Sequence, residues 1–185
     1  MTVQDLFSRL VAALDASEIP YMLTGSYASS VHGIPRATKD IDIVIFPTRD
    51  QLTRLIAQFP DGSYYADLND AVEALRRRSQ FNVLDFATGW KVDFIIPPFS
   101  EFHEEEFARR RAIPVEGVSL FVASPEDIIL AKLQWAKAGN SSRQLEDAAN
   151  VLSTQRSRLD LAYIERWVRK LGLGEQWLAT QRLAG

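Results

Sequence analysis

The pattern of apolar residues changes at Ser124, and this change restricts the possible folds more than any other feature of the chain. Before Ser124, short runs rich in Ile and Val alternate with amphipathic segments of helical spacing, as in mixed α/β domains. After Ser124, the apolar residues recur only at helical spacing. We therefore expect a mixed α/β region over residues 1–123, with a sheet and flanking helices, and an α-helical C-terminal region over residues 124–185 packed on it.

The boundaries of the segments support this division. Runs of β-branched and aromatic residues bounded by Gly, Pro or polar residues predict strands at 21–24, 40–46, 81–86, 90–96 and 118–122. The third and fourth of these strands form a hairpin with Thr88-Gly89 at its turn. Apolar residues at helical spacing predict helices near 1–14, 27–32, 49–59, 70–78, 102–107, 125–137, 142–152 and 160–171, and from 175 onwards.

Composition excludes several classes of protein. The chain of 185 residues has no cysteine, which excludes disulfides, thiol catalysis and thiolate metal sites. No apolar run is long enough to span a membrane and the N-terminus does not resemble a secretion signal, so we expect a cytoplasmic protein without a membrane partner. With a net charge of −3 the surface is not a general polyanion trap. The arginine triplets at 76–78 and 109–111 fit either exposed helix ends or phosphate contacts.

Two acids stand in the strand predicted at 40–46. Asp40 and Asp42 are two residues apart, so both carboxylates lie on the same face of the strand. The Ile and Val residues around them indicate an interior strand with little water, where like charges repel and burial penalises each charge. A divalent cation, Mg²⁺ or Mn²⁺, would relieve both effects because it prefers hard oxygen ligands. Alternatively, the two acids cap a loop or pair with Lys39 and Arg36.

Gly25 and Ser26 follow the strand at 21–24 and begin a predicted short helix. Unpaired backbone N–H groups at a helix start favour an anion such as phosphate. Gly25 permits close approach of the backbone, and the Ser26 hydroxyl adds a donor. Alternatively, this is a helix cap that serves stability alone. A phosphate site beside a carboxylate metal site is what phosphoryl or nucleotidyl transfer requires.

Asp93 is the only acid in the apolar strand at 90–96. An acid in such a strand is seldom left unpaired, so Asp93 is the candidate third metal ligand, or the base that takes the proton from an attacking hydroxyl. Asp85 on the partner strand competes for this role. In a two-residue hairpin, however, Asp85 would point to the face opposite Asp93.

The order of these elements resembles the signature of the nucleotidyltransferase superfamily: Gly-Ser at 25–26, Asp-x-Asp at 40–42 and a single Asp in the later segment KVDFI. The segment SPEDIILAKLQWAKAGNSSRQLEDAANVL, which begins at Ser124, is similar to the AbiEii-like toxin branch of that superfamily. The resemblance implies a nucleotidyltransferase fold and metal-dependent transfer of a nucleotide from an NTP to an acceptor hydroxyl. In the toxin branch the acceptor is often an RNA end, commonly tRNA, and a cognate antitoxin is an expected partner.

The resemblance also implies roles for individual residues. Ser26, next to Gly25, would hold the triphosphate, Asp40 and Asp42 would bind the metal, and Asp93 would be the third ligand or the base. In AbiEii-like relatives a helix Lys and a later helix Asp belong to the site, and Lys132 and Asp147 match those places.

Lys132 also stands out without the resemblance. It falls in the middle of the apolar face of the helix at 125–137, which consists of Ile128, Ile129, Leu133, Trp135 and Ala136. Its ammonium group would either reach a triphosphate or extend to the helix edge. Asp147 would equally fit an ordinary surface pair with Arg143, four residues before it.

Two further functions stay open. One is modification of a small molecule, as by an aminoglycoside-type nucleotidyltransferase, and the other is a non-catalytic antitoxin or nucleotide-binding module. The presence of all three acids favours an enzyme. We expect a helix-end or solvent role for the isolated His32 and His103, and core positions for three tryptophans: Trp135, Trp167 and Trp177.

Overall fold

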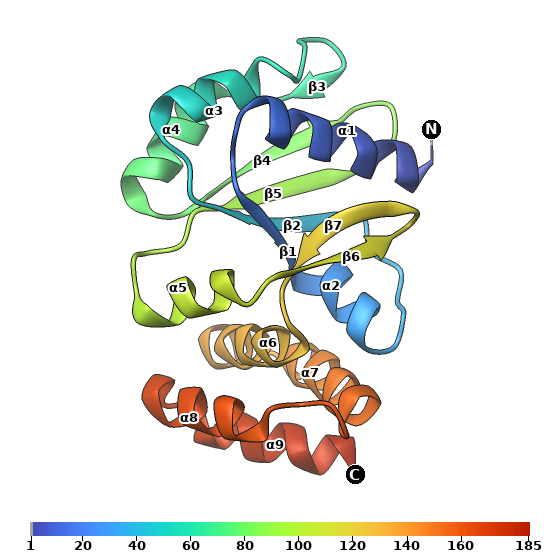
Figure 1. The fold of residues 1–185 in the computed structure, drawn as a ribbon, viewed down its shortest axis with the longest axis vertical. Coiled ribbons are helices and arrows are strands. Elements are labelled where there is room, and N and C mark those ends of the chain that lie inside the picture. The colour runs from blue at the N-terminus through green and yellow to red at the C-terminus, as the bar shows by residue number, and fades with distance from the viewer. Residues whose placement is uncertain (1) are drawn as a thin grey trace. The chain divides into compact units, whose positions relative to one another are not determined.

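The computed structural model describes residues 2–185 (Figure 1). These residues form two compact units. The first unit contains the residues up to Leu23 together with Thr38–Val122, and the second contains Thr24–Ala37 and Ala123–Gly185. The division after Val122 lies next to the change in sequence pattern. Residues 24–37, however, group with the C-terminal helices, because the helix that they contain packs on two of those helices.

The first unit is built around a mixed sheet with the strand order β3-β4-β5-β2-β1-β7-β6. The pairs β2–β5 and β1–β7 are parallel, whereas the pairs β3–β4, β4–β5 and β6–β7 are antiparallel. The strands are β1 (Tyr21–Thr24), β2 (Asp40–Ile45), β3 (Tyr64–Tyr65), β4 (Gln80–Asp85), β5 (Lys91–Ile95), β6 (Arg111–Val115) and β7 (Val118–Val122).

Five strands and the hairpin of β4 and β5 confirm the sequence-based prediction, whereas β3 and β6 were not predicted. β3 has only two residues, too few for a periodic pattern. β6 contains Pro114, which argues against a strand in the middle of a sheet. Since β6 is the last strand in the sheet order, a proline is tolerated there.

One face of this sheet is apolar and buried. Alternation places Ile41 and Ile43 of β2 on this face, and the register puts Val92 and Phe94 of β5 directly beside them. The helices of the unit are α1 (Val3–Ala16), α3 (Arg49–Ile56), α4 (Leu68–Arg77) and α5 (Glu101–Ala108). α4 packs on β4 and α3, and α1 packs on α3 and β7.

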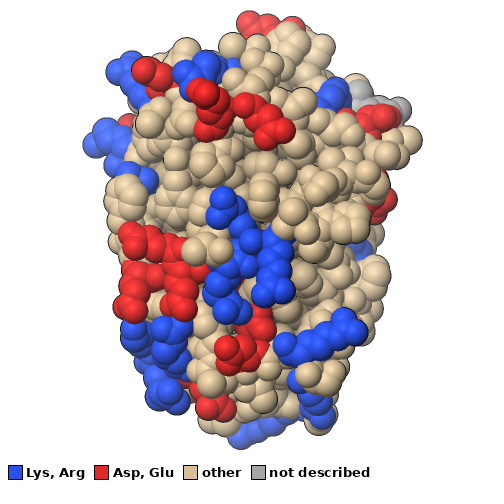
Figure 2. Space-filling model, viewed as in Figure 1, with Lys and Arg blue, Asp and Glu red and all other residues tan. Residues whose placement is uncertain are grey.

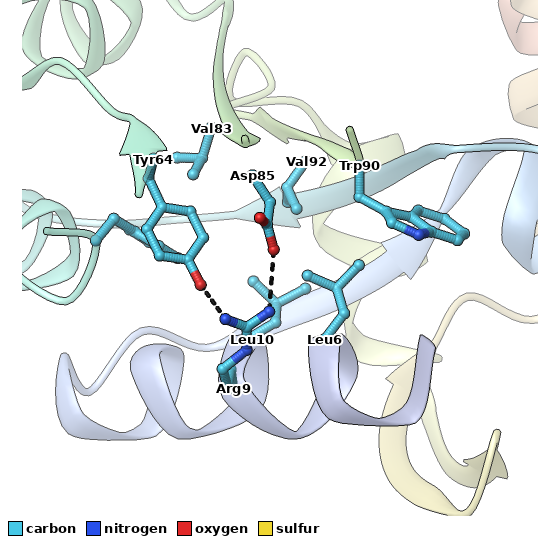
Figure 3. A pocket seen from close by; sticks show the side chains of 9 residues that line it. Leu6, Arg9, Leu10, Tyr64, Val83, Asp85, Trp90 and Val92 are labelled. Carbon is cyan, nitrogen blue, oxygen red and sulfur yellow. Dashed lines mark hydrogen bonds and ion pairs between the residues drawn. The ribbon is translucent and has the colours of Figure 1, made fainter. Parts of the chain in front are cut away.

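Helix α1 is held against the hairpin of β4 and β5 by a polar contact within an apolar pocket (Figure 3). Arg9 of α1 lies 3.0 Å from the carboxylate of Asp85, and it also donates a hydrogen bond to the Tyr64 hydroxyl. Leu6 and Val92 are among the apolar residues that line the pocket. Asp85, itself buried, therefore serves the packing of α1 on the hairpin.

The second unit is helical. It contains α2 (Gly25–His32), α6 (Pro125–Gly139), α7 (Ser142–Gln155), α8 (Leu161–Leu171) and α9 (Gly174–Ala184). Ser124 caps α6 and Pro125 occupies its first turn, as the sequence predicted. α2 packs on α6 and α7, and α7 packs on α9. None of the helices in the described residues has the length and apolar character needed to cross a membrane.

The prediction for the tryptophans is confirmed for two of them and wrong for the third. Trp167 and Trp177 are buried, but Trp135 is 57% exposed. On α6 the buried arc is centred near Ile129 and Ala136, and Trp135 falls at its border. A wheel drawn from hydrophobicity alone includes Trp135 because it cannot show where the neighbouring helices end.

Gly33 lies where α2 approaches the backbone of α7. A Cβ atom at this position would stand 3.1 Å from the backbone nitrogen of Val151 and 3.2 Å from the carbonyl carbon of Asn150. Both are main-chain atoms, so relief requires a shift of a whole helix. We expect Gly33→Ala to lower the free energy of unfolding by about 1–3 kcal/mol, measured by urea denaturation.

The matched control is Gly139→Ala at the end of α6, where an added Cβ would meet no atom within 4 Å. This substitution should leave stability unchanged or raise it by about 0.5–1 kcal/mol, since alanine favours the helix. Equal stability of the two variants would contradict the close approach of α2 to α7.

Candidate active site

Three carboxylates lie on the sheet face opposite the buried apolar one. In the register of the parallel strands β2 and β5, Asp40 is opposite Lys91 and Asp42 is opposite Asp93. Residues directly opposite each other point to the same side of a sheet, and alternate residues of one strand share a side. Asp40, Asp42, Asp93 and Lys91 therefore share one face. We call these four residues the acidic cluster.

Asp85 lies on the other face, as expected. Leu84 is the residue of β4 that stands opposite Lys91, so its neighbour Asp85 points away from the acidic cluster. It bonds Arg9 there, and its second oxygen accepts a hydrogen bond from the backbone of Ala87 at 2.9 Å. Asp85 and Asp93 are thus two buried acids on adjacent strands with different surroundings.

Burial differs strongly among the three acids of the cluster. Asp93 is only 6% exposed, and Asp42 is half-buried. The side chain of Asp40 is 57% exposed, so the expectation that both acids of β2 lie away from water is wrong for Asp40. The reason is its position as the first residue of β2, before the strand is covered.

Lys91 contacts two of the three acids. Its Nζ is 2.8 Å from Oδ2 of Asp93 and 3.5 Å from Oδ1 of Asp40. The hydrogen bond to Asp93 raises the pKa of Lys91 above its ordinary value, so the group is an ammonium at neutral pH. The other oxygen of Asp93, Oδ1, is buried and has no hydrogen-bond partner among the described residues.

The donor chemistry of the cluster suits a divalent cation, although the site is not closed around one point. Within residues 2–185 no three His, Cys, Asp or Glu side chains are gathered as in a formed metal site. The ammonium of Lys91 bridges Asp40 and Asp93 instead. The oxygen ligands and the unused acceptor capacity of Asp93 Oδ1 nevertheless fit Mg²⁺ or Mn²⁺.

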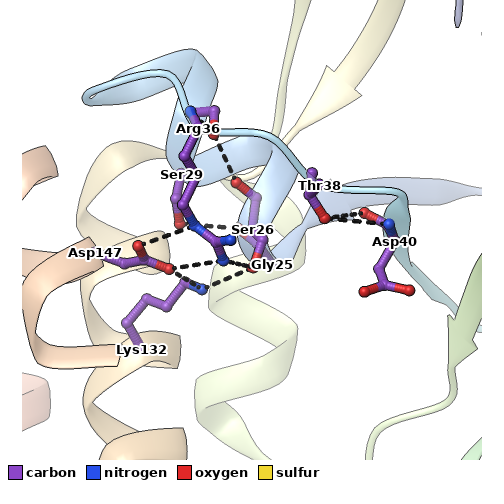
Figure 4. A network of polar contacts seen from close by, with 9 residues as sticks. Gly25, Ser26, Ser29, Arg36, Thr38, Asp40, Lys132 and Asp147 are labelled. Carbon is purple, nitrogen blue, oxygen red and sulfur yellow. Dashed lines mark hydrogen bonds and ion pairs between the residues drawn. The ribbon is translucent and has the colours of Figure 1, made fainter. Parts of the chain in front are cut away.

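A second group of polar residues forms around Ser26 in the helical unit (Figure 4). Gly25, the first residue of α2, has a φ of 65°, a conformation that glycine adopts without strain. Thr24 makes no side-chain cap at this helix start in the described part of the chain. Arg36 donates a hydrogen bond of 2.6 Å to the Ser26 hydroxyl, and Nζ of Lys132 is 3.4 Å from the same oxygen.

Asp147 holds both of these cations. Its carboxylate is 2.9 Å from Nζ of Lys132 and 3.3 Å from Nε of Arg36. Lys132 and Asp147 are buried, with exposures of 3% and 6%, so neither a lysine that extends to the helix edge nor a surface pair of Asp147 with Arg143 describes them. The two cations and one carboxylate have one net positive charge beside Ser26. We call Ser26, Arg36, Lys132 and Asp147 the cationic cluster.

Lys91 and Arg36 were not singled out from the sequence as site residues. For Lys91 a signal existed, because Lys-x-Asp on a strand places both side chains on one face, as for Asp40 and Asp42. Arg36 was considered as a partner of the acids in β2. It bonds Asp147 instead, 111 positions later in the chain, and no local pattern contains that contact.

The remaining candidates have structural surroundings. His32 lies at the end of α2 with Nε2 2.8 Å from the carbonyl oxygen of Ala123, and its burial lowers its pKa. His103 pairs with Glu106 at 3.1 Å. Glu106 is buried, so the acidic helix α5 is not exposed on all sides.

Members of both arginine triplets contact acidic or aromatic side chains. Arg76 and Arg77 are exposed at the end of α4 and both pair with Glu73. Arg110 lies over the ring of Phe107. On the face shown in Figure 2, basic side chains stand in separate groups with acidic groups beside them. The exposed helix end predicted for residues 76–78 is therefore observed for Arg76 and Arg77.

Removal of Lys132 should leave the Asp147 carboxylate with Arg36 as its remaining cation. We expect Lys132→Met to lower the free energy of unfolding by about 1–3 kcal/mol, less than the 3–5 kcal/mol typical of a buried charge left alone. The double variant Lys132→Met/Asp147→Asn should recover part of the loss, as measured by urea denaturation. Additive effects of the two substitutions would contradict the pairing.

Comparison with known proteins gives similarity in structure but not in sequence. No protein-family model and no curated protein sequence matches the chain. The crystal structure of ANT(2″)-Ia in complex with adenylyl-2″-tobramycin matches with a TM-score of 0.55 and 14% identity, over 99% of this chain and 97% of that chain. The solution structure of the antibiotic-resistance factor ANT(2″)-Ia matches with a TM-score of 0.52 and 14% identity, over 93% and 96%.

A third similar structure is that of an antigenic nucleotidyltransferase-like protein from Paracoccidioides brasiliensis, with a TM-score of 0.49 and 16% identity over 95% of this chain and 91% of that chain. At identities this low, the similarity to ANT(2″)-Ia concerns the fold alone. The chain has the nucleotidyltransferase fold, with a mixed sheet, flanking helices and a helical C-terminal half, which confirms the predicted fold class.

Proposed function

We propose that this protein is a metal-dependent nucleotidyltransferase, which transfers a nucleotide from an NTP to an acceptor hydroxyl. The observation that carries the proposal is the register of β2 and β5, which places Asp40, Asp42 and Asp93 on one sheet face. A fold shared with other proteins does not by itself imply an activity, whereas these residues have the chemistry that the activity needs. The roles of the side chains follow from their chemistry.

Asp40, Asp42 and Asp93 would hold Mg²⁺ or Mn²⁺. When bound, such an ion neutralises phosphate charge and stabilises the oxygens that attack and leave. Asp93 is also the candidate base, because its Oδ1 is buried and lacks a hydrogen-bond partner among the described residues. Its other oxygen, Oδ2, lies 2.8 Å from Nζ of Lys91.

Ser26 and Lys132, together with Arg36, would bind the triphosphate. The cationic cluster supports this role because it has an excess of positive charge beside a hydroxyl and an uncapped helix start at Gly25. Asp147 contacts the cations rather than the nucleotide in this scheme, and it fixes their positions. The φ of 65° at Gly25 favours glycine, so no side chain stands at the turn into α2.

The proposed reaction is a displacement at the α-phosphorus of the NTP. The acceptor oxygen forms a bond to this phosphorus, the bond to the bridging oxygen of the β-phosphate breaks, and pyrophosphate leaves. The proton of the acceptor hydroxyl passes to Asp93. Positioning and charge stabilisation account for most of the catalysis in reactions of this type.

We further propose that the acceptor is an RNA end, such as that of a tRNA, and that the protein is the cytoplasmic toxin of a toxin-antitoxin pair. The support for this finer proposal is the resemblance of residues 124–152 to the AbiEii-like branch. A second candidate is transfer to a small aminoglycoside-type molecule. The observation that favours it is the fold similarity to ANT(2″)-Ia, whose crystal structure contains adenylyl-2″-tobramycin.

The test is incubation with each α-³²P-labelled NTP and Mg²⁺, in the presence of total RNA or of an aminoglycoside mixture. Label on RNA would support the toxin-type acceptor, and label on the small molecule would support the second candidate. If neither acceptor, with any NTP, gains label, the proposed activity is wrong.

Asp93 and Asp85 provide a matched pair of variants for this assay. Asp93→Asn should lower the transfer rate on the order of a hundredfold or more, because Asp93 is both a proposed metal ligand and the proposed base. Asp85→Asn should lower stability, since Arg9 loses its carboxylate, but should keep most activity below its melting temperature. The reverse pattern, with active Asp93→Asn and inactive Asp85→Asn, would assign the chemistry to the opposite sheet face.

A further inference from the structure

We propose that Lys91 is an internal counter-ion of the acidic cluster: it holds Asp40 and Asp93 together without metal and competes with a divalent cation for them. The inference rests on the metal site of the proposed function. It concerns a residue that the transfer reaction itself does not require.

The three carboxylates on one sheet face repel one another. Asp42 and Asp93 are directly opposite in the register, and Asp40 is two residues from Asp42 on the same strand. Asp93 is buried, so water screens its charge poorly. A cation at this face therefore relieves the repulsion even when no metal is bound. The ammonium of Lys91, at 2.8 Å from Asp93 and 3.5 Å from Asp40, supplies it.

The same position makes Lys91 a competitor for a metal ion. An ammonium group has three donors and no lone pair, so it cannot be a ligand, and its charge repels a cation. Lys91 contacts Oδ2 of Asp93 and Oδ1 of Asp40, two of the carboxylates that a divalent ion would use. Its side chain is 40% exposed and has a flexible stem, so the ammonium can move into solvent. A bound divalent ion would then neutralise the buried Asp93 carboxylate in its place.

The net charge of the cluster follows from this arrangement. Three carboxylates and one ammonium have a net charge that a single divalent cation balances. Removal of the ammonium would leave all three negative charges for the metal. The metal-free cluster should then be less stable, and its affinity for a divalent cation should rise.

The experiment is a titration with Mn²⁺ alone, in which electron paramagnetic resonance measures the free ion. Lys91→Met should bind Mn²⁺ about tenfold more tightly than the wild type, because a repulsive charge is removed. In EDTA the same variant should melt a few degrees lower, and Mn²⁺ should raise its melting temperature by more than that of the wild type.

Two further variants control for net charge and for folding. Lys39 is exposed and makes no ion pair in the described part of the chain, so Lys39→Met should change Mn²⁺ affinity by only about twofold. Lys91→Arg keeps the charge and should bind Mn²⁺ no more tightly than the wild type. If Lys91→Met does not fold, as judged by circular dichroism, Lys91→Gln takes its place.

The outcomes separate this inference from the proposed function. If the wild type binds Mn²⁺ and Lys91→Met binds it equally or more weakly, the counter-ion role is wrong and the metal site stands. Tighter binding by Lys91→Arg would likewise overturn the inference. If the wild type binds no Mn²⁺ up to millimolar concentration, with or without an NTP, the metal site and the inference both fail.

Discussion

The pairing of β2 with β5 is the constraint on which the rest of the structure depends. Alternation along these strands sends Ile41, Ile43, Val92 and Phe94 to the buried face and the charged residues to the other. A shift of one residue in this register would bury the carboxylates under the helices and expose the isoleucines. The apolar core therefore fixes the position of the acids. The free-energy cost of a register shift therefore maintains the candidate site as well as the fold.

The second unit contains a buried pair of opposite charges. Here Lys132 and Asp147 are buried together, and each would be strongly destabilising alone. Arg36 adds a second cation to the same carboxylate, although Asp147 needs only one. Both cations also lie within hydrogen-bond distance of the Ser26 hydroxyl. The proposed role of the cationic cluster in binding an anion rests on these two cations beside Ser26.

Much of the fold could be predicted from local patterns. The strands around Ile43 and Phe94 have the alternation and β-branched residues that a half-buried strand requires, and Ser124-Pro125 marks the start of α6. The exposure of Trp135 and the strand that contains Pro114 could not be predicted, because both depend on where neighbouring elements end. The placing of residues 24–37 with the C-terminal helices is likewise a tertiary effect.

In the candidate site, too, the features that depend on local sequence could be predicted and the contacts between distant residues could not. The shared face of Asp40 and Asp42 follows from their spacing, and the structure places Asp93 directly opposite Asp42. The partners of Asp147 do not follow from spacing, since Arg36 is distant in sequence and Arg143, the nearby arginine, makes no ion pair with it among the described residues. Metal binding and catalysis by these residues stay predictions, because they depend on ligands rather than on the chain.

The most direct measurement of the central claim is anomalous X-ray diffraction from crystals grown with Mn²⁺ and a non-hydrolysable NTP analogue. We predict an anomalous peak about 2.0–2.2 Å from oxygens of Asp40, Asp42 and Asp93, the ligand distance typical of a small hard cation. We also predict a Lys91 ammonium that has moved away from Asp93, and phosphate oxygens in contact with Ser26 and Lys132. A peak bound by other residues, or a nucleotide that contacts neither Ser26 nor Lys132, would contradict the account.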